Sequence, residues 1–251
     1  MQQDPLVTMQ GDLDRALSKP PEQRRWAMII DVRKCVGCHA CTLGCATENQ
    51  LPPKLWYRPV FEQERGKYPK VTRTFVARPC MQCDRPPCVE ACPKKGPGGA
   101  TWKETKGIAA GTVPIDYAKC VGCGKCVAAC PYGARALDDG ATHAGPSAAP
   151  MPYESKPAFE YGTALARTGK ALPVGKARKC HFCVHRLAAG QLPACVSTCL
   201  GRAGVFGDEN DPESQIARLK KAGKVQLLKA GAGTAPRVYY VSDEKVEVQN
   251  G

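Results

Sequence analysis

Apolar residues occur along this chain in short runs, which predict strands and few long helices. Residues 24–31 (RRWAMIID) hold an uninterrupted apolar run, and residues 71–77 and 237–242 are rich in β-branched and aromatic side chains, so each range is predicted to form a strand. The turn-rich residues 96–116 predict a hairpin. Helices are predicted around residues 13–17 and from Asp211, with a proline in its first turn, to a stop at Gly223.

Two polar stretches lie outside this pattern. Residues 1–24 end in a proline-containing segment, and we expect them to be an N-terminal extension that lies on a partner. Residues 137–176 are rich in Ala, Gly, Pro and Ser without periodicity, and a loop this long is usually functional or partner-bound, so we expect a partner-contacting insertion. The predicted core then comprises residues 25–136 and 177–210, and residues 211–251 form a C-terminal helix and strand.

The composition indicates a protein with many loops. Aromatic residues make up only 6% of the 251 residues, and the chain holds 25 glycines and 22 prolines. A chain of this length can bury a core, but this one calls for additional cross-links. Its sixteen cysteines are the obvious source, because metals and clusters cross-link loops in core-poor proteins.

The cysteines fall into four groups of four. The third group, CVGCGKCVAACP at 120–131, has the run by which bacterial ferredoxins hold cubane iron–sulfur clusters: the first three thiolates bind one cluster, and the fourth, followed by a proline, binds another. The first group has the same spacing, and the second and fourth have wider gaps. The groups are Cys35, Cys38, Cys41 and Cys45; Cys80, Cys83, Cys88 and Cys92; Cys120, Cys123, Cys126 and Cys130; and Cys180, Cys183, Cys195 and Cys199.

The four groups form an internal repeat. Residues 30–45 and 115–130 are identical at nine of sixteen positions without a gap, and the second and fourth groups share A-R-x-C-x-x-C followed by C-V-x-x-C. Such a duplication predicts two pseudo-symmetric halves. The predicted fold is therefore α+β and loop-rich, built from two bacterial ferredoxin-like modules.

Three kinds of cross-link compete for these cysteines. Disulfides are disfavoured because C-x-x-C-x-x-C packs thiols too densely for unstrained pairing in several consecutive loops. Zinc is the stronger rival, but structural zinc sites usually pair two C-x-x-C knuckles and require no third cysteine followed by a fourth and a proline. The spacing therefore favours iron–sulfur clusters.

The net charge of +13 first suggests nucleic acid or an anionic membrane as a partner. Four [4Fe–4S] clusters with thiolate ligands would contribute roughly −8 to −12, because the charge of a bound cofactor belongs in the sum. Much of the basic excess is then internal compensation. Lysines beside cysteines fit that interpretation: Lys34, Lys119, Lys125 and Lys179.

The four groups in this order resemble the four-cluster electron-transfer subunit of the complex iron–sulfur molybdoenzyme family, which includes polysulfide, dimethyl sulfoxide, tetrathionate and arsenate reductases. The resemblance covers about residues 25–210. It implies that the first and fourth groups exchange their last cysteines, as do the second and third. The implied ligand sets are A (Cys35, Cys38, Cys41, Cys199), B (Cys180, Cys183, Cys195, Cys45), C (Cys80, Cys83, Cys88, Cys130) and D (Cys120, Cys123, Cys126, Cys92).

The same resemblance implies four [4Fe–4S] clusters in a near-linear chain between a molybdopterin (Mo or W) catalytic subunit and an integral-membrane quinone-reactive subunit. The chain itself has no apolar run long enough to span a bilayer. We expect a non-catalytic subunit, peripheral on the bacterial inner membrane. We favour the periplasmic side of the membrane over the cytoplasmic side. Because the start of the chain lacks the apolar core of a signal peptide, a periplasmic location would require export on the partner's signal.

Some residues depart from this pattern or need a separate interpretation. Ala46 and Leu200 replace the ferredoxin proline, which leaves those turns less constrained. Sixteen thiolates saturate four cubanes, so His39, His181 and His185 are expected outside the ligand shell. Trp102 and Phe182 are expected to pack around a cluster, and backbone N–H groups of loops containing Gly37, Gly122 and Gly124 to hydrogen-bond sulfur.

Two alternative functions stay open on the residues alone. A similar subunit could serve a hydrogenase or another membrane oxidoreductase. A basic zinc-ribbon protein that binds nucleic acid is the alternative of another class, although the scarcity of aromatic residues for base stacking counts against it.

Overall fold

A computed structural model describes residues 3–144, 149, 151–167, 169–223 and 225–248. Its centre is a mixed four-stranded sheet in the order β6-β1-β8-β7, formed by β1 (Trp26–Asp31), β6 (Gly204–Asp208), β7 (Val225–Gln226) and β8 (Val238–Val241). β1 pairs antiparallel with β6 and parallel with β8, so segments from both ends of the chain meet in one sheet. The strands predicted at 24–31 and 237–242 are confirmed.

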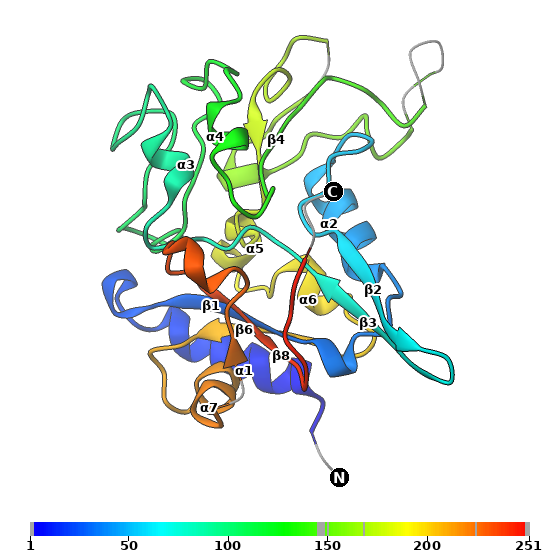
Figure 1. Cartoon of the computed structure of the whole chain (residues 1–251). Coiled ribbons are helices and arrows are strands. Elements are labelled where there is room, and N and C mark those ends of the chain that lie inside the picture. Colours follow the sequence, from blue (N-terminus) through cyan, green and yellow to red (C-terminus); the bar gives the residue numbers. More distant parts are fainter. Residues whose placement is uncertain (1–2, 145–148, 150, 168, 224, 249–251) are drawn as a thin grey trace.

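Every residue of β1 is buried. An uninterrupted apolar run is typical of a strand covered on both faces. The ring of Trp26 stacks on Phe206 of β6 with centroids 5.5 Å apart, and Phe206 meets the ring of Phe182 edge-on at 5.4 Å. Helices α1 and α7 lie below this sheet in Figure 1, and the cysteine-bearing segments lie above it.

The N-terminal segment packs on this chain's own sheet. Helix α1 (Pro5–Leu17) begins at Asp4, whose carboxylate accepts the Leu6 N–H, and it is longer than the helix predicted at 13–17. Met9, Leu13 and Ala16 are buried and share the hydrophobic core with the sheet. The apolar face of α1 contacts β6 and α7 (Gln215–Lys221), so this helix packs on the chain itself, and a contact of residues 1–24 with a partner stays a prediction.

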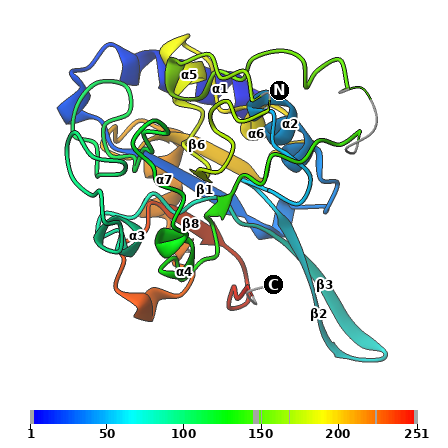
Figure 2. The same cartoon turned by 90° about the horizontal axis from the view of Figure 1, so that it is seen from above.

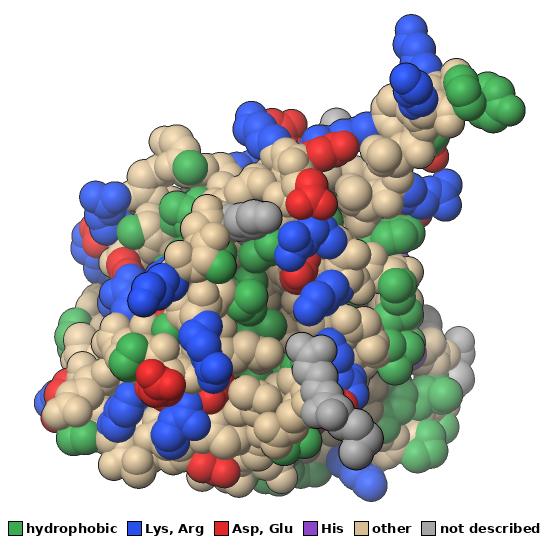
Figure 3. All heavy atoms as spheres, turned by 90° about the horizontal axis from the view of Figure 1, so that it is seen from below, with side chains coloured by type: hydrophobic (Ala, Val, Ile, Leu, Met, Phe, Trp, Pro, Cys, Tyr) green, Lys and Arg blue, Asp and Glu red, His purple; other side chains and the backbone are tan. Residues whose placement is uncertain are grey.

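The connection between the first two cysteine groups forms a hairpin, β2 (Val60–Lys67) and β3 (Lys70–Ala77), with Tyr68 almost fully exposed at its tip. β3 confirms the strand predicted at 71–77. β2 was not predicted, because its residues are mostly polar and it is exposed along one side. Figure 2 shows the hairpin extending away from the body, and the matching projection in Figure 3 carries basic and hydrophobic side chains.

The insertion at 137–176 is closed at its base by β4 (Ala136–Leu137), which pairs with β5 (Ala177–Arg178). At this base, Arg178 of β5 donates to two buried carboxylates of the insertion, to Asp138 Oδ2 at 2.7 Å and to Glu160 Oε1 at 2.6 Å. Tyr57, which precedes the hairpin, donates its hydroxyl to the same Glu160 oxygen at 2.8 Å. The described part of the insertion is thus tied to the body by charged groups excluded from water. Its residues 145–148, 150 and 168 lie outside the described residues.

Two smaller expectations are corrected. Residues 96–116 form only isolated bridges, such as Thr101 to Ile115, and no regular hairpin. Helix α7 begins at Gln215, because the Ser214 hydroxyl caps it by accepting the Ala217 N–H, whereas the Asp211 carboxylate accepts from Glu213 and Arg15. Within the described residues, no helix combines the length and apolarity required to cross a bilayer.

Candidate iron–sulfur cluster sites

Each C-x-x-C loop turns on a left-handed residue directly before its second cysteine. These residues are Gly37, Gln82, Gly122 and Phe182, with φ between 47° and 70°. Glycine adopts this conformation without strain. At Gly37 a Cβ would lie 2.5 Å from the Phe75 ring, and at Gly122 it would lie 2.3 Å from the Gly175 carbonyl oxygen, so close approach also requires glycine at both positions.

The third and fourth cysteines of each group sit on or just after a short helix in the same way. The third cysteine is always the second helical residue, and the fourth follows four residues later, about one turn further. The helices are α2 (Ala40–Asn49) with Cys41 and Cys45, α3 (Pro87–Glu90) with Cys88, α4 (Lys125–Ala128) with Cys126, and α6 (Ala194–Ser197) with Cys195. One local geometry therefore occurs four times.

The helices meet in two pairs, α2 with α6 and α3 with α4. In the first pair Gly44 approaches Thr198 so closely that a Cβ at Gly44 would lie 2.9 Å from the Thr198 side chain. The Thr198 hydroxyl also lies 3.4 Å from the Ala40 carbonyl oxygen. The first cysteine group thus packs against the fourth, and the second against the third.

Two of the implied cysteine sets each line one small cavity. Cys35, Cys38, Cys41 and Cys199 line the first. Cys80, Cys83, Cys88 and Cys130 line the second. In both cavities the fourth cysteine comes from a different group than the other three.

The other two sets are brought together by the same helix pairs. Burial raises the pKa of the Cys45 thiol, and the neighbouring Cys183, Cys195 and Cys180 raise it further. Burial likewise raises the pKa of Cys126, where Arg135 opposes the effect and Cys120 and Cys92 add to it. Cys45 thus lies among cysteines of the fourth group, and Cys92 among those of the third.

The surroundings of these cysteines fit an anionic sulfur cluster. Four N–H groups point at sulfur, from Phe182 to Cys180 (3.5 Å), Ala134 to Cys130 (3.4 Å), Ala203 to Cys199 (3.2 Å) and the Asn49 amide to Cys45 (3.5 Å). Such donors stabilise thiolate ligands and raise reduction potentials. The Gly37 N–H also opposes the effect of burial, which raises the pKa of Cys35; the corresponding role of Gly122 and Gly124 stays a prediction.

The cysteines of sets A and C surround hollows. Among the described residues no three His, Cys, Asp or Glu side chains come close enough to hold a single metal ion. A structural zinc ion needs four ligands at about 2.0–2.3 Å in one tetrahedron, whereas a cubane holds its thiolates apart on separate irons. Cavities lined by four thiolates, as in sets A and C, fit such clusters.

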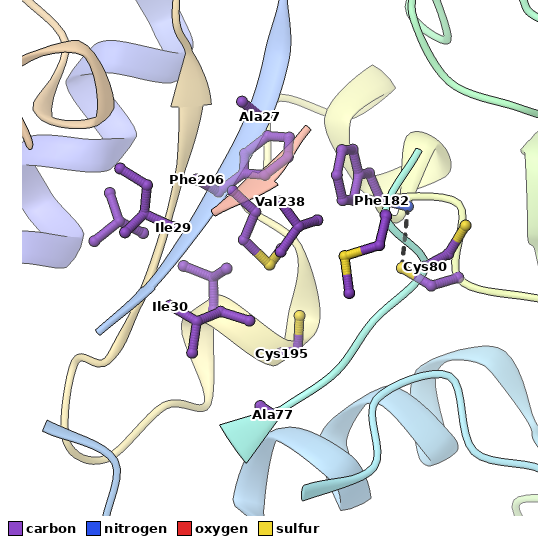
Figure 4. Close-up of a cluster of buried hydrophobic side chains, with 14 of the residues drawn as sticks. Ala27, Ile29, Ile30, Ala77, Cys80, Phe182, Cys195, Phe206 and Val238 are labelled. Atoms are coloured by element: carbon purple, nitrogen blue, oxygen red, sulfur yellow. Dashed lines mark hydrogen bonds between the residues drawn. The ribbon is translucent and has the colours of Figure 1, made fainter. Parts of the chain in front are cut away.

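Burial differs along the sites. Cys38 and Cys123 are exposed, whereas Cys45, Cys180, Cys183 and Cys195 are buried. Figure 4 shows Cys80 and Cys195 within the hydrophobic core, near Ile30, Val238 and Phe182. Sets B and C thus lie inside the molecule, and sets A and D each reach the surface.

The histidines and aromatic residues beside the cysteines have structural partners. His181 is buried, which lowers its pKa to about 3, and its Nε2 lies 3.0 Å from Asn49 Oδ1, whereas His185 pairs with Glu48 and His39 is exposed at the start of α2. The Trp102 indole donates to Glu104 at 2.8 Å. Phe182 packs on Phe206 beside Cys180 and Cys183, as expected for packing around a cluster.

Most of the buried cations beside the cysteines were not predicted from the sequence. Lys34, Lys119 and Lys125 are exposed, and only Lys179 of the expected lysines is buried. Arg58, Arg78 and Arg135 are buried instead, and each leaves a guanidinium Nε without a partner. Burial alone would lower the pKa of Arg58, but Cys195 and Cys41 raise it above its ordinary value. Only the A-R-x-C pattern, which includes Arg78, offered any signal in the sequence.

Replacing Gly44 with valine tests the contact between α2 and α6. The branched side chain would collide with Thr198 and separate two helices that carry cysteines of sets A and B. We expect the isolated protein to lose iron from these two sets and to retain the rest, as measured by iron and acid-labile sulfide analysis. Gly11→Val in α1 is the control, because a Cβ there meets nothing within 4 Å; equal iron loss in both variants would contradict the packing argument.

Sixteen cysteines in four groups, with N–H donors at several of their sulfur atoms, define an iron–sulfur protein of the ferredoxin type, and comparisons with known proteins agree. The sequence profile of a 4Fe-4S binding domain matches residues 113–136, and that of a 4Fe-4S dicluster domain matches residues 168–209. The chain belongs to the four-cluster iron–sulfur electron-transfer subunits of the complex iron–sulfur molybdoenzyme family. Its cofactors are [4Fe–4S] clusters, four by its cysteine count.

Three relatives illustrate the membership. The chain is 51% identical to a selenate reductase subunit of Mesobacillus selenatarsenatis over 94% of this chain and 78% of the relative. It is 37% identical to a tetrathionate reductase subunit of Salmonella typhimurium, over 87% and 73%. It is 35% identical to the arsenate respiratory reductase iron–sulfur subunit of a Shewanella species, over 86% and 96%.

Proposed function

We propose that sets A to D, as implied by the resemblance, each bind one [4Fe–4S] cluster and relay single electrons in the order A, B, C, D or its reverse. A bound cluster supplies one-electron redox chemistry and carries about −2 when oxidised and about −3 when reduced. The observation that carries the proposal is that the fourth cysteine of each group lies with the first three of another. This exchange gives two pseudo-symmetric ferredoxin-like modules, one with sets A and B and the other with C and D.

Neighbouring sets support the order. Cys195 of set B is close enough to Cys41 and Cys199 of set A for their charges to act on it. Cys180 of set B is similarly close to Cys80 of set C. Arg135 faces Cys88 of set C and Cys126 of set D. Each set therefore has a neighbour in the proposed order, which a relay requires.

The two ends of the relay are proposed to be the docking points for partners. Beside the exposed Cys38 of set A, Val36 and Leu200 are 64% and 70% exposed, and beside Cys123 of set D, Val121 is 59% exposed. Exposed apolar side chains around a cluster give a partner a surface from which it can exclude water. Residues 137–176 are proposed to add partner contacts, since Leu137 and Phe159 expose apolar surface.

The partners are proposed to be a molybdopterin catalytic subunit at one end and a membrane quinone-reactive subunit at the other. The support is that the relatives bear the names of selenate, tetrathionate and arsenate reductase subunits. Attachment to the periplasmic face of the inner membrane, after export on the partner's signal, is proposed from the resemblance to the family. Catalysis belongs to the partner.

Purification of the native complex through this chain tests the proposal. We expect molybdenum or tungsten in a near 1:1 ratio with this chain, together with pterin, and reduction of the clusters by the physiological quinol or by the reduced catalytic subunit. Nickel without molybdenum or tungsten would assign the subunit to a hydrogenase instead. Protease protection in intact spheroplasts separates the two faces of the membrane.

A further inference from the structure

Four buried cations among the described residues have no carboxylate partner: Arg58, Lys179, Arg135 and Arg78. Arg78 faces Cys80 and Cys130 of set C, whereas each of the other three faces two sets. Arg58, Lys179 and Arg135 are 3%, 0% and 3% exposed, and within the described residues none of them forms an ion pair with Asp or Glu. The buried Arg178, by contrast, pairs with two carboxylates. A buried charge without a counter-charge carries a large free-energy cost, so these three cations call for an anion nearby.

The positions of the three cations match the gaps between the cysteine sets. The Arg58 carbonyl oxygen accepts from the hydroxyl of Thr42, which follows Cys41 of set A, at 2.7 Å. The Arg58 guanidinium and the side chain of Val196, which follows Cys195 of set B, both lie within 4 Å of the position that a Cβ on Gly204 would take. The charge of Arg58 acts on Cys41, Cys195 and Cys180. Arg58 therefore lies between sets A and B. Its Nε has no hydrogen-bond partner.

Lys179 lies between sets B and C. It directly precedes Cys180 of set B, and its ammonium donates to the Cys180 carbonyl oxygen at 2.9 Å. The same ammonium lies 3.4 Å from Oε1 of Gln82, which stands between Cys80 and Cys83 in the loop of set C. Its charge acts on Cys88 of that set as well.

Arg135 lies between sets C and D. It lines the cavity that is formed by the four cysteines of set C. Its charge also acts on Cys126 of set D. One amino group donates to Thr101 Oγ1 at 3.1 Å, and Nε has no partner. Each of the three gaps in the proposed order therefore holds one buried cation.

We propose that Arg58, Lys179 and Arg135 are positioning residues that supply the counter-charge shared by the two clusters on either side of each gap. This inference rests on the proposed cluster sets. Each cation favours the additional negative charge of a reduced cluster, and therefore raises the reduction potential of both neighbours. It also balances the anionic charge that would otherwise oppose the presence of electrons on adjacent clusters.

The test is a potentiometric titration of the anaerobic holoprotein, followed by electron paramagnetic resonance, for Arg58→Met, Lys179→Met and Arg135→Met. Each variant should lower the equilibrium constant for one-electron reduction of two clusters by tenfold or more, about 59 mV for each midpoint. Arg58→Met and Arg135→Met should shift two different pairs of signals. Lys179→Met should shift one signal from each pair, a pattern that needs no prior assignment of signals.

Matched controls are Lys34→Met and Lys125→Met. Lys34 and Lys125 directly precede Cys35 and Cys126, as Lys179 directly precedes Cys180. Unlike Lys179 they are exposed, so solvent screens their charges. Midpoints unchanged in the three test variants, or shifted equally in the controls, would overturn the inference. In that case normal iron and sulfide in the unmodified protein would leave the proposed function intact, whereas their absence there would remove both.

If a methionine variant fails to load its clusters, variants that keep the positive charge show whether the charge or the shape of the side chain is required. Arg58→Lys, Lys179→Arg and Arg135→Lys should load all clusters and keep midpoints nearer to those of the unmodified protein than any methionine variant. If these also fail to load, then shape and not charge is required at that position, and the counter-charge role is rejected.

Discussion

Replacing Cys83 and Cys130 together with alanine is expected to alter one cluster and leave three intact. Both residues line the same cavity, although they belong to different groups. The matched variant, Cys123→Ala with Cys130→Ala, removes two cysteines of one group but one ligand from each of sets C and D. It should therefore alter two clusters.

The two double variants separate the exchanged arrangement from a local one. If each group held its own cluster, Cys83→Ala with Cys130→Ala would alter two signals, and Cys123→Ala with Cys130→Ala would alter one. Counting the changed signals by electron paramagnetic resonance after full reduction distinguishes the arrangements. The expected effect is large, because a cubane with two thiolates missing cannot be retained in its native form.

Arg178→Met is expected to destabilise the protein by about 3–5 kcal/mol, because removal of one partner from a buried ion pair leaves uncompensated buried charge. Here both Asp138 and Glu160 would lose the same guanidinium. The change is measured as the shift in the urea midpoint of the anaerobic holoprotein at pH 7. Arg33→Met, whose pair with Asp31 is partly exposed, is the control and should cost about 1 kcal/mol or less.

The pH dependence of this pair of variants follows from the two carboxylates. Burial alone would raise the pKa of Glu160. The charge of Arg178 and the hydrogen bonds that the Glu160 carboxylate accepts instead hold this pKa below its ordinary value of 4.5. Burial is likewise outweighed at Asp138, whose pKa is held below 3.8 by Arg167 and Arg178. A carboxyl with a lowered folded-state pKa contributes stability that is present above its unfolded pKa and lost as pH falls through the folded value.

In Arg178→Met the shift of the Glu160 pKa changes direction. Without the guanidinium, burial dominates and raises its pKa, so its contribution is lost as pH rises above about 4.5. The destabilisation relative to the native protein should therefore be larger at pH 7 than near pH 4. A difference that is constant across this range would contradict the assignment of Arg178 as the counter-ion of buried carboxylates.

The local geometry of the sites could be predicted because it depends on residues close in sequence. Two cysteines separated by two residues fix a loop, and the left-handed residue before the second is glycine in the first and third groups. The short helix that carries the third cysteine follows from the same spacing. The strands at the centre of the sheet were predictable as well, because a short apolar run is typical of a buried strand.

The remainder depends on contacts between distant residues. Arg58 and Arg135 each meet cysteines of two groups, one of which is distant in sequence. Adjacency in the sequence therefore selected the exposed Lys34 and Lys125 instead. β2 was missed because a strand in an exposed hairpin needs no apolar face. The packing of the N-terminal helix on the sheet was not predicted, because its three buried apolar residues, Met9, Leu13 and Ala16, form too weak a periodic pattern.

The central claim is that four cubanes are bound by sixteen thiolates. Anaerobic isolation of the unmodified chain, with analysis of iron, acid-labile sulfide and zinc in the same sample, tests this most directly. The account predicts about sixteen irons and sixteen sulfides per chain, with negligible zinc and with broad visible absorption that bleaches on reduction. Stoichiometric zinc in a colourless protein that gives no resonance signal after reduction would contradict it.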